Sequence, residues 1–159
     1  MQEFERASFH KEMVDEENYT GSYVFEPLER GFGTTIGNTL CKIMISNLPG
    51  TGVIGFSCDN FNENRTIVNG ILEDVNGIIL NLKKIQLNCS EDGVKKLHIS
   101  KKGPAIIQTA DLICPECVNI VDPDQFICSL EKGASLEMDV YIATLTGYKS
   151  SLENKDLFG

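Results

Sequence analysis

The chain is poor in basic residues and in apolar runs. It has no tryptophan, two histidines, and 14 lysines and arginines against 23 aspartates and glutamates, which gives a net charge of −9. Lysine and arginine form no run longer than a pair, so sequence-independent binding of DNA or RNA is disfavoured. No segment reaches the ~18 continuous apolar residues of a membrane helix. Residues 1–18 are charged and lack the apolar centre of a secretory signal. These absences predict a cytoplasmic protein.

Cysteine is present but does not form a recognisable framework. The six cysteines lie in otherwise apolar stretches, and in a reducing compartment we interpret them as small buried hydrophobic residues. Cys114 and Cys117 have the spacing of a zinc knuckle, but the second pair that a structural zinc site needs is missing. A small metal-binding or redox protein built on these two thiols is therefore only a minor alternative, and the favoured interpretation is a turn.

The strongest pattern is a helix predicted over residues 34–48, ended by Pro49 and Gly50. At 100° per residue, its polar side chains occupy only a narrow strip. An ordinary surface helix has an apolar stripe about 100° wide, and this one is roughly twice as wide. We expect the helix to bury two faces, one of them against a partner. One apolar arc consists of Phe32, Ile36, Leu40, Ile43 and Met44.

The rest of the chain predicts a mostly β structure with one further helix. Short strands are expected near residues 9–14, 23–25 and 53–56, and a loop over 60–64. A helix is expected over 70–84, and a hairpin over 85–99. Further short strands are expected at 105–107, 118–121 and 126–128. Strict alternation over 136–144 predicts the clearest strand, and the polar end from Gly147 is expected to be frayed.

The residues show no active site. Nucleophilic catalysis needs a base within reach of a Ser or Cys, but His98 lies in the middle of a predicted strand flanked by lysines and is interpreted as an exposed strand residue. The glycines before the first helix match neither a P-loop nor a dinucleotide fingerprint, so residues 29–33 are interpreted as a tight turn. The carboxylates at 73, 74, 137 and 139 are interpreted as solvated. No catalytic residue, cofactor or metal is expected.

Several strings resemble the N-terminal domain of the bacterial RNA polymerase alpha subunit. They begin with Glu26-Pro-Leu-Glu-Arg-Gly-Phe-Gly-Thr-Thr, Gly37-Asn38 and Leu48-Pro49-Gly50. Later matches are Gly70-Ile-Leu-Glu-Asp-Val, Ile79-Leu-Asn-Leu-Lys-Lys, Gly103-Pro104, Thr109-Ala-Asp, Val121-Asp-Pro and Gly133-Ala. The resemblance is almost collinear from about Gly21 to Tyr148.

The resemblance implies an α+β fold. Residues 1–50 would form part of the dimerisation subdomain (a strand and a long helix). Residues 51–148 would form a mostly β insert subdomain with one helix, and 149–159 a frayed tail. The implied function is a non-catalytic assembly module of DNA-directed RNA polymerase, itself a nucleotidyltransferase. Its implied partners are another alpha chain, through the apolar arc defined above, and the beta and beta′ subunits. The residues implied in beta and beta′ docking are Arg30, Lys42, Ile45 and Lys83.

The sequence departs from the family at positions implied in docking. Where the family usually has two arginines, this chain has Cys41 and Lys42, and a lysine lacks the bidentate fork of arginine. The family loop that contacts beta differs at residues 61–66. The strands and partner helix that complete the dimerisation subdomain do not follow residue 148. On this resemblance we expect a truncated alpha subunit that does not dimerise in the usual way. Its uncovered helix should instead favour self-association. The alternative is a stand-alone alpha-like regulatory paralogue that binds polymerase subunits.

Overall fold

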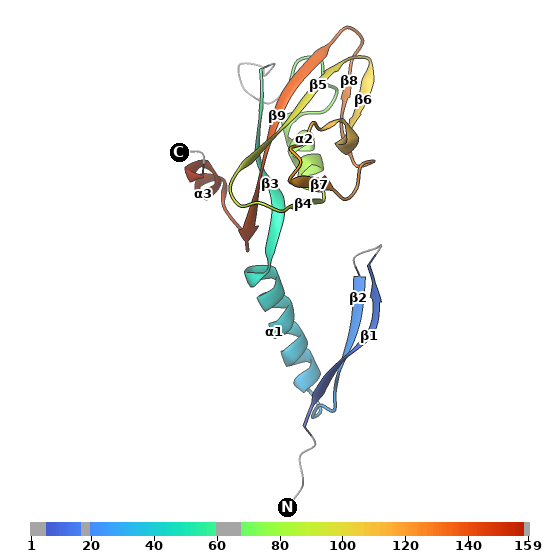
Figure 1. The fold of residues 1–159 in the computed structure, drawn as a ribbon, viewed down its shortest axis with the longest axis vertical. Coiled ribbons are helices and arrows are strands. Elements are labelled where there is room, and N and C mark those ends of the chain that lie inside the picture. Colours follow the sequence, from blue (N-terminus) through green and yellow to red (C-terminus); the bar gives the residue numbers. More distant parts are fainter. Residues whose placement is uncertain (1–5, 17–19, 60–67, 158–159) are drawn as a thin grey trace, which may run out of the picture. The chain divides into compact units, whose positions relative to one another are not determined.

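The structure, a computed structural model, describes residues 6–16, 20–59 and 68–157. The chain divides into two compact units, Met1–Ile45 and Ser46–Gly159, which are described separately (Figure 1). The architecture is mixed, with many strands and few helices, as the expected α+β class requires. The predicted loops over 60–64 and 61–66 lie in or across residues 60–67, outside the described part of the chain. The subdomain limits at residues 50 and 148 stay predictions.

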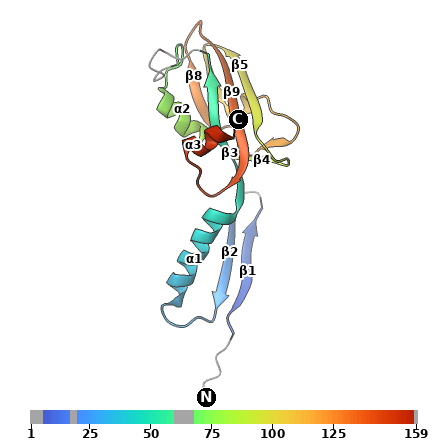
Figure 2. The same cartoon turned by 90° about the vertical axis from the view of Figure 1, so that its left-hand side faces the viewer.

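The first unit consists of a β-hairpin followed by a helix, both visible in Figure 2. Strand β1 (Ser8–Asp15) pairs antiparallel with β2 (Thr20–Glu26). Helix α1 (Phe32–Asn47) follows. The two strands and the helix predicted here are confirmed, with slightly different ends.

A tight turn starts α1. The amide N–H of Phe32 donates to the carbonyl oxygen of Glu29 at 3.1 Å, and Gly31 has a φ of 93°. A side chain is strained at this left-handed φ, so the turn favours glycine. The helix ends at Asn47, because Pro49 cannot continue it and instead begins the next strand. The predicted turn and helix stop are both confirmed.

The second unit contains a five-stranded antiparallel sheet in the order β5-β9-β3-β4-β7 and a two-stranded sheet, β6-β8. The strands are β3 (Pro49–Cys58), β4 (Leu87–Cys89), β5 (Lys95–Lys102), β6 (Ala105–Gln108), β7 (Val118–Ile120), β8 (Phe126–Leu130) and β9 (Ser135–Thr146). The pairing of β3 with β9 is long, running from Pro49 opposite Thr146 to Cys58 opposite Met138. A 3₁₀ turn, η1 (Thr109–Asp111), follows β6.

The core of this unit follows the alternation in β9. Leu136, Met138, Val140 and Ile142 are each at most 1% exposed, while the residues between them are more open. Because successive strand side chains point to opposite faces, this alternation places every second residue in the core. The predicted strand over 136–144 is confirmed. Buried side chains from β5, β6, β8 and α2 complete the same cluster.

The hairpin predicted over residues 85–99 is wrong. Strand β4 pairs with β3 and β7, whereas β5 pairs with β9. Leu87, Leu97 and Ile99 are all buried, so the alternation located buried residues correctly. The pattern could not identify the strand partner, because many strands of this unit present the same alternation.

Helix α2 (Val75–Leu82) is shorter than the predicted helix over 70–84. The segment before it pairs with β8 instead: Ile71 bridges to Leu130, and the amide of Leu72 donates to the carbonyl of Ser129 at 3.1 Å. Asp74 then caps the helix by accepting from the amide of Gly77 at 2.8 Å. Glu73 is not simply solvated as expected, because its carboxylate accepts from the amide of Ser129 at 2.7 Å.

The polar end of the chain forms a short helix, α3 (Ser151–Asp156), where a frayed end was expected. Ser150 and Glu153 form a capping box, in which each side chain accepts from the other residue's backbone amide. Ser-x-x-Glu is the sequence signal for this box, and it explains the helix. Within the described part of the chain, no helix is long and apolar enough to cross a membrane.

Candidate interaction surface

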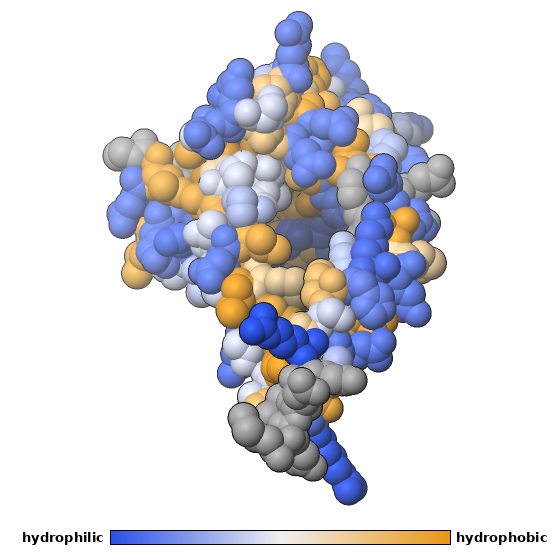
Figure 3. Space-filling view, turned by 60° about the horizontal axis from the view of Figure 1, so that its bottom comes forward, coloured by the Kyte–Doolittle hydropathy of each residue, from blue (hydrophilic) through white to orange (hydrophobic). Residues whose placement is uncertain are grey.

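The apolar arc predicted on α1 is open to solvent. Phe32, Leu40, Ile43 and Met44 are between 45% and 53% exposed, and Ile36 is half-buried. No residue of α1 is buried. Figure 3 shows apolar residues, in orange, reaching the surface on the face that it displays. The structure therefore places the five predicted dimerisation residues on one helix and leaves them largely uncovered. The expectation that one face of the helix is buried within its own chain is wrong for the described residues, since none of α1 is buried.

This exposure extends through the first unit. None of the described residues between 6 and 45 is buried. An isolated two-stranded hairpin is marginally stable in water, and most helix stability in proteins comes from packing an apolar face. A hairpin and a helix without buried side chains therefore lack the usual source of stability. The described residues of this unit therefore leave their apolar side chains without a core.

An exposed aromatic cluster that the sequence pattern does not predict lies on the hairpin. The rings of Phe9 and Tyr23 stack with centroids 5.2 Å apart, and Phe25 lies 6.4 Å from Phe9. These side chains are 62%, 53% and 36% exposed. The register places Phe9 opposite Phe25, so both rings project from the same face. Only a correct pairing of the two strands could have identified this cluster, because its members come from different strands.

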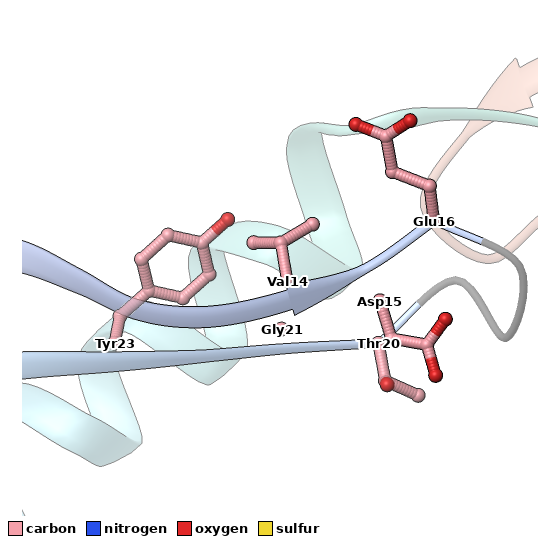
Figure 4. Close-up of a pocket in the computed structure, with 6 residues that line it drawn as sticks. All are labelled: Val14, Asp15, Glu16, Thr20, Gly21 and Tyr23. Carbon is pink, nitrogen blue, oxygen red and sulfur yellow. The ribbon is translucent and has the colours of Figure 1, made fainter.

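A hollow of about 590 Å³ lies at the turn end of the same hairpin, lined by Val14, Asp15, Glu16, Thr20, Gly21 and Tyr23 (Figure 4). The carboxylates of Asp15 and Glu16 point in different directions in this view. Convergent acid and base groups are needed for catalysis, and the hollow does not provide them.

The residues implied in docking the large subunits are all exposed. Arg30, Lys42 and Ile45 belong to the first unit, and Ile45 is 70% exposed. Lys83 belongs to the second unit, where it directly follows α2 as the C-cap residue. It lines a groove of about 1020 Å³ bounded by residues of β3, α2, β9 and α3. Exposure makes all four available for contacts, and their roles stay predictions.

The Cys114–Cys117 segment forms a turn with two half-buried thiols, as expected. The thiol of Cys114 donates to the carbonyl of Leu112 at 3.5 Å. Among the described residues, no group of three or more histidine, cysteine, aspartate or glutamate side chains could hold a metal ion. The described residues therefore provide no set of ligands that would support the metal-binding alternative.

His98 is the centre of a charged cross-strand cluster on β5 and β9. Its Nδ1 lies 2.8 Å from Asp139 Oδ1 and its Nε2 lies 3.0 Å from Glu137 Oε2, while Lys96 Nζ lies 2.7 Å from the other oxygen of Asp139. The hydrogen bond to Asp139 is the main cause that raises the pKa of His98. The expectation that Glu137 and Asp139 are merely solvated is therefore wrong.

This cluster predicts a pH dependence of stability. Because the folded-state pKa of His98 lies above its unfolded value of about 6.5, its stabilising effect is complete below that value. The effect is lost as the pH rises through the folded pKa. We expect the urea midpoint of the wild-type protein to fall as the pH rises above about 6.5, and the His98→Gln variant to lose this dependence. The midpoints are measured by equilibrium urea unfolding monitored by circular dichroism at several pH values. The same change of midpoint with pH in both proteins would contradict the assignment.

Comparison with known proteins agrees with this architecture. Residues 60–158 match the family model described as the RNA polymerase Rpb3/RpoA insert domain. The chain is 41% identical over 157 residues to the DNA-directed RNA polymerase subunit alpha of Leuconostoc mesenteroides subsp. mesenteroides, covering 99% of this chain and 49% of that protein. It is 39% identical over 155 residues to the corresponding subunit of Limosilactobacillus reuteri, covering 98% and 49%.

The chain spans about half the length of these curated relatives. The family model accounts for most of the second unit, and the similarity to the relatives extends through the hairpin and α1. The resemblance deduced from the motifs is therefore confirmed, and this chain belongs to the RNA polymerase alpha-subunit family.

Proposed function

We propose that the chain is a non-catalytic assembly module of DNA-directed RNA polymerase that acts in the cytoplasm. In this proposal, the α1 arc packs against a second alpha-type chain, and polar and apolar residues outside the arc contact the large subunits. The single observation that carries the proposal is the extended apolar surface of α1 without a buried residue. Such a surface, in a unit whose described residues include no buried side chain, is typical of a site that contacts another protein.

The proposed dimer contact has a simple energetic basis. Fully burying a large aliphatic or aromatic side chain contributes about 1.5–3 kcal/mol, so several half-exposed residues together can offset part of the cost of association. The net charge of −9 and the absence of Lys or Arg runs disfavour nucleic acid as the partner. These properties favour a protein with a matching apolar face as the binding partner.

The proposed docking of the beta subunit depends on a lysine where the family usually has arginine. Lys42 is exposed on α1 and retains the positive charge without the bidentate geometry. Capture of purified beta by the immobilised chain tests the proposal. We expect Lys42→Ala to weaken binding about two- to fivefold, the usual range for an exposed charged contact, and Lys42→Arg to strengthen it.

Lys132→Ala is the matched control, because Lys132 is an exposed lysine in the turn between β8 and β9. It should leave the capture of beta unchanged. Failure of the wild-type chain to capture beta would overturn the docking proposal. Equal losses in the Lys42→Ala and Lys132→Ala variants would show that the contact reflects net charge rather than this position on α1.

A further inference from the structure

The groove of about 1020 Å³ that Lys83 lines lies entirely within the second unit. Its lining comes from β3 and β9 of the five-stranded sheet and from α2 and α3, four elements that can be followed in Figure 2. Much of this lining is apolar and only half-buried, including Val53, Ile54 and Leu145. Half-buried apolar side chains gathered in a groove are typical of a surface that another molecule covers.

The charge of this groove is opposite to that of the whole chain. Lys83, Lys149 and Lys155 line it, and its described lining residues include no aspartate or glutamate. The chain as a whole has a net charge of −9. Lys149 Nζ lies 3.9 Å from Glu153 Oε1, and neither Lys83 nor Lys155 forms an ion pair with another described residue. The groove therefore attracts an anionic ligand.

Helix α3 turns its lysine to the groove and its carboxylates away from it. Ser151, Asn154 and Lys155 line the groove, at the three- and four-residue steps that place side chains on one helical face. At about 100° per residue, Glu153 lies about 160° around the helix from Lys155, and Asp156 about 160° from Asn154. The Oδ1 atom of Asn154 is enclosed and has no hydrogen-bond partner among the described residues. A peptide N–H in the groove would supply the missing donor once this side chain turns outward.

Strand β3 presents two glycines to the groove. Gly50 and Gly52 lie opposite Leu145 and Ala143 of β9, and all four residues line the groove. A Cβ atom at either glycine would meet nothing within 4 Å, and neither glycine has a left-handed φ. No contact with a described residue therefore requires glycine at these positions. Glycine weakens a strand, and it often marks a place where a ligand or another backbone approaches closely.

We propose that the groove binds an extended, acidic peptide segment of a partner protein. Its backbone lies over the glycines of β3, and its carboxylates pair with Lys83, Lys149 and Lys155. Successive side chains of an extended chain point to opposite sides, so apolar residues that alternate with the acidic ones pack on the half-buried lining. The aliphatic lining suits such side chains better than a sugar-phosphate backbone. The inference goes beyond the assembly role proposed above, because it assigns a separate site on the second unit and the chemistry of its ligand.

Fluorescence anisotropy with a labelled octapeptide of alternating glutamate and leucine tests the proposal on the whole chain. We expect saturable binding that weakens as sodium chloride is added, because salt screens exposed charges. Lys83→Ala and Lys155→Ala should each weaken binding about two- to fivefold, the usual range for an exposed charged contact. Lys132→Ala is the matched control, because this exposed lysine does not line the groove.

Gly52→Ala tests where the peptide backbone lies. The added methyl group meets no described atom within 4 Å, so the urea midpoint should not fall. Peptide binding should weaken about fivefold or more, because the methyl group projects into the groove. Gly37→Ala makes the same change on α1, where a Cβ atom also meets nothing within 4 Å, and it should bind the peptide like the wild type.

Four results would each overturn the proposal. They are the absence of saturable binding, equal binding of an octapeptide of alternating lysine and leucine, displacement of the acidic peptide by an oligothymidylate, and equal losses in Lys83→Ala, Lys155→Ala and Lys132→Ala. A folded Gly52→Ala variant that binds like the wild type would refute the position of the backbone on β3. Circular dichroism of each variant controls for folding. Capture of beta is a separate readout, so failure of this proposal and failure of the docking proposal are distinguishable.

Discussion

Replacing Ile107 by alanine is expected to lower the free energy of unfolding by about 2–5 kcal/mol, the usual cost of truncating a buried isoleucine. Ile107 lies on β6 opposite Cys128 of β8 and is 0% exposed. The substitution removes apolar contacts and leaves a cavity, because closely packed neighbours relax only in part. Urea unfolding monitored by far-ultraviolet circular dichroism measures the loss.

The adjacent Ile106 supplies a matched control. It occupies the same strand but is 64% exposed, because successive strand side chains point to opposite faces. Ile106→Ala makes the same chemical change and should cost less than about 1 kcal/mol. Similar losses for the two variants would contradict the placement of β6 and the register that turns Ile107 towards the core.

The sequence predicted this core better than it predicted the pairing of strands. Alternation identified β9 and its inward residues, because the period of two is a property of the strand itself. Strand pairing depends on which edges meet in space, and the predicted pairing of residues 85–89 with 94–99 failed for that reason. The shorter α2 has a similar cause. The residues before Asp74 form backbone hydrogen bonds to β8 and are not part of the helix.

In the candidate interaction surface, too, some features follow from the sequence pattern and others do not. The α1 arc was predictable because its residues recur along one helix at a known angle, and in the structure they lie on α1 and are largely exposed. The aromatic cluster of the hairpin was not predictable. It joins residues from two different strands, so it depends on strand register rather than on local spacing.

Replacing Leu40 by glutamate is expected to weaken self-association of the chain about 100-fold or more. Leu40 lies in the middle of the α1 arc and is 45% exposed. Burial of its remaining surface contributes roughly 1 kcal/mol per copy, and each residue of a two-fold interface is used twice. A carboxylate enclosed in that interface adds a desolvation cost of several kcal/mol. Size-exclusion chromatography with light scattering over a concentration series measures the change in dimer dissociation.

Asn38→Glu is the control for this variant, since it introduces the same charge on the polar strip of the same helix. Asn38 is about 160° from Leu40 around the helix at 100° per residue, outside the proposed contact. We expect Asn38→Glu to self-associate like the wild type, and Leu40→Glu to be monomeric with an unchanged far-ultraviolet spectrum. Because neither side chain is buried in the described chain, both variants should retain the fold of the second unit.

A wild-type chain that stays monomeric at high concentration would refute self-association through α1. Dimers that survive Leu40→Glu would instead place the contact on another surface, of which the exposed Phe9–Tyr23–Phe25 cluster is the next to be tested.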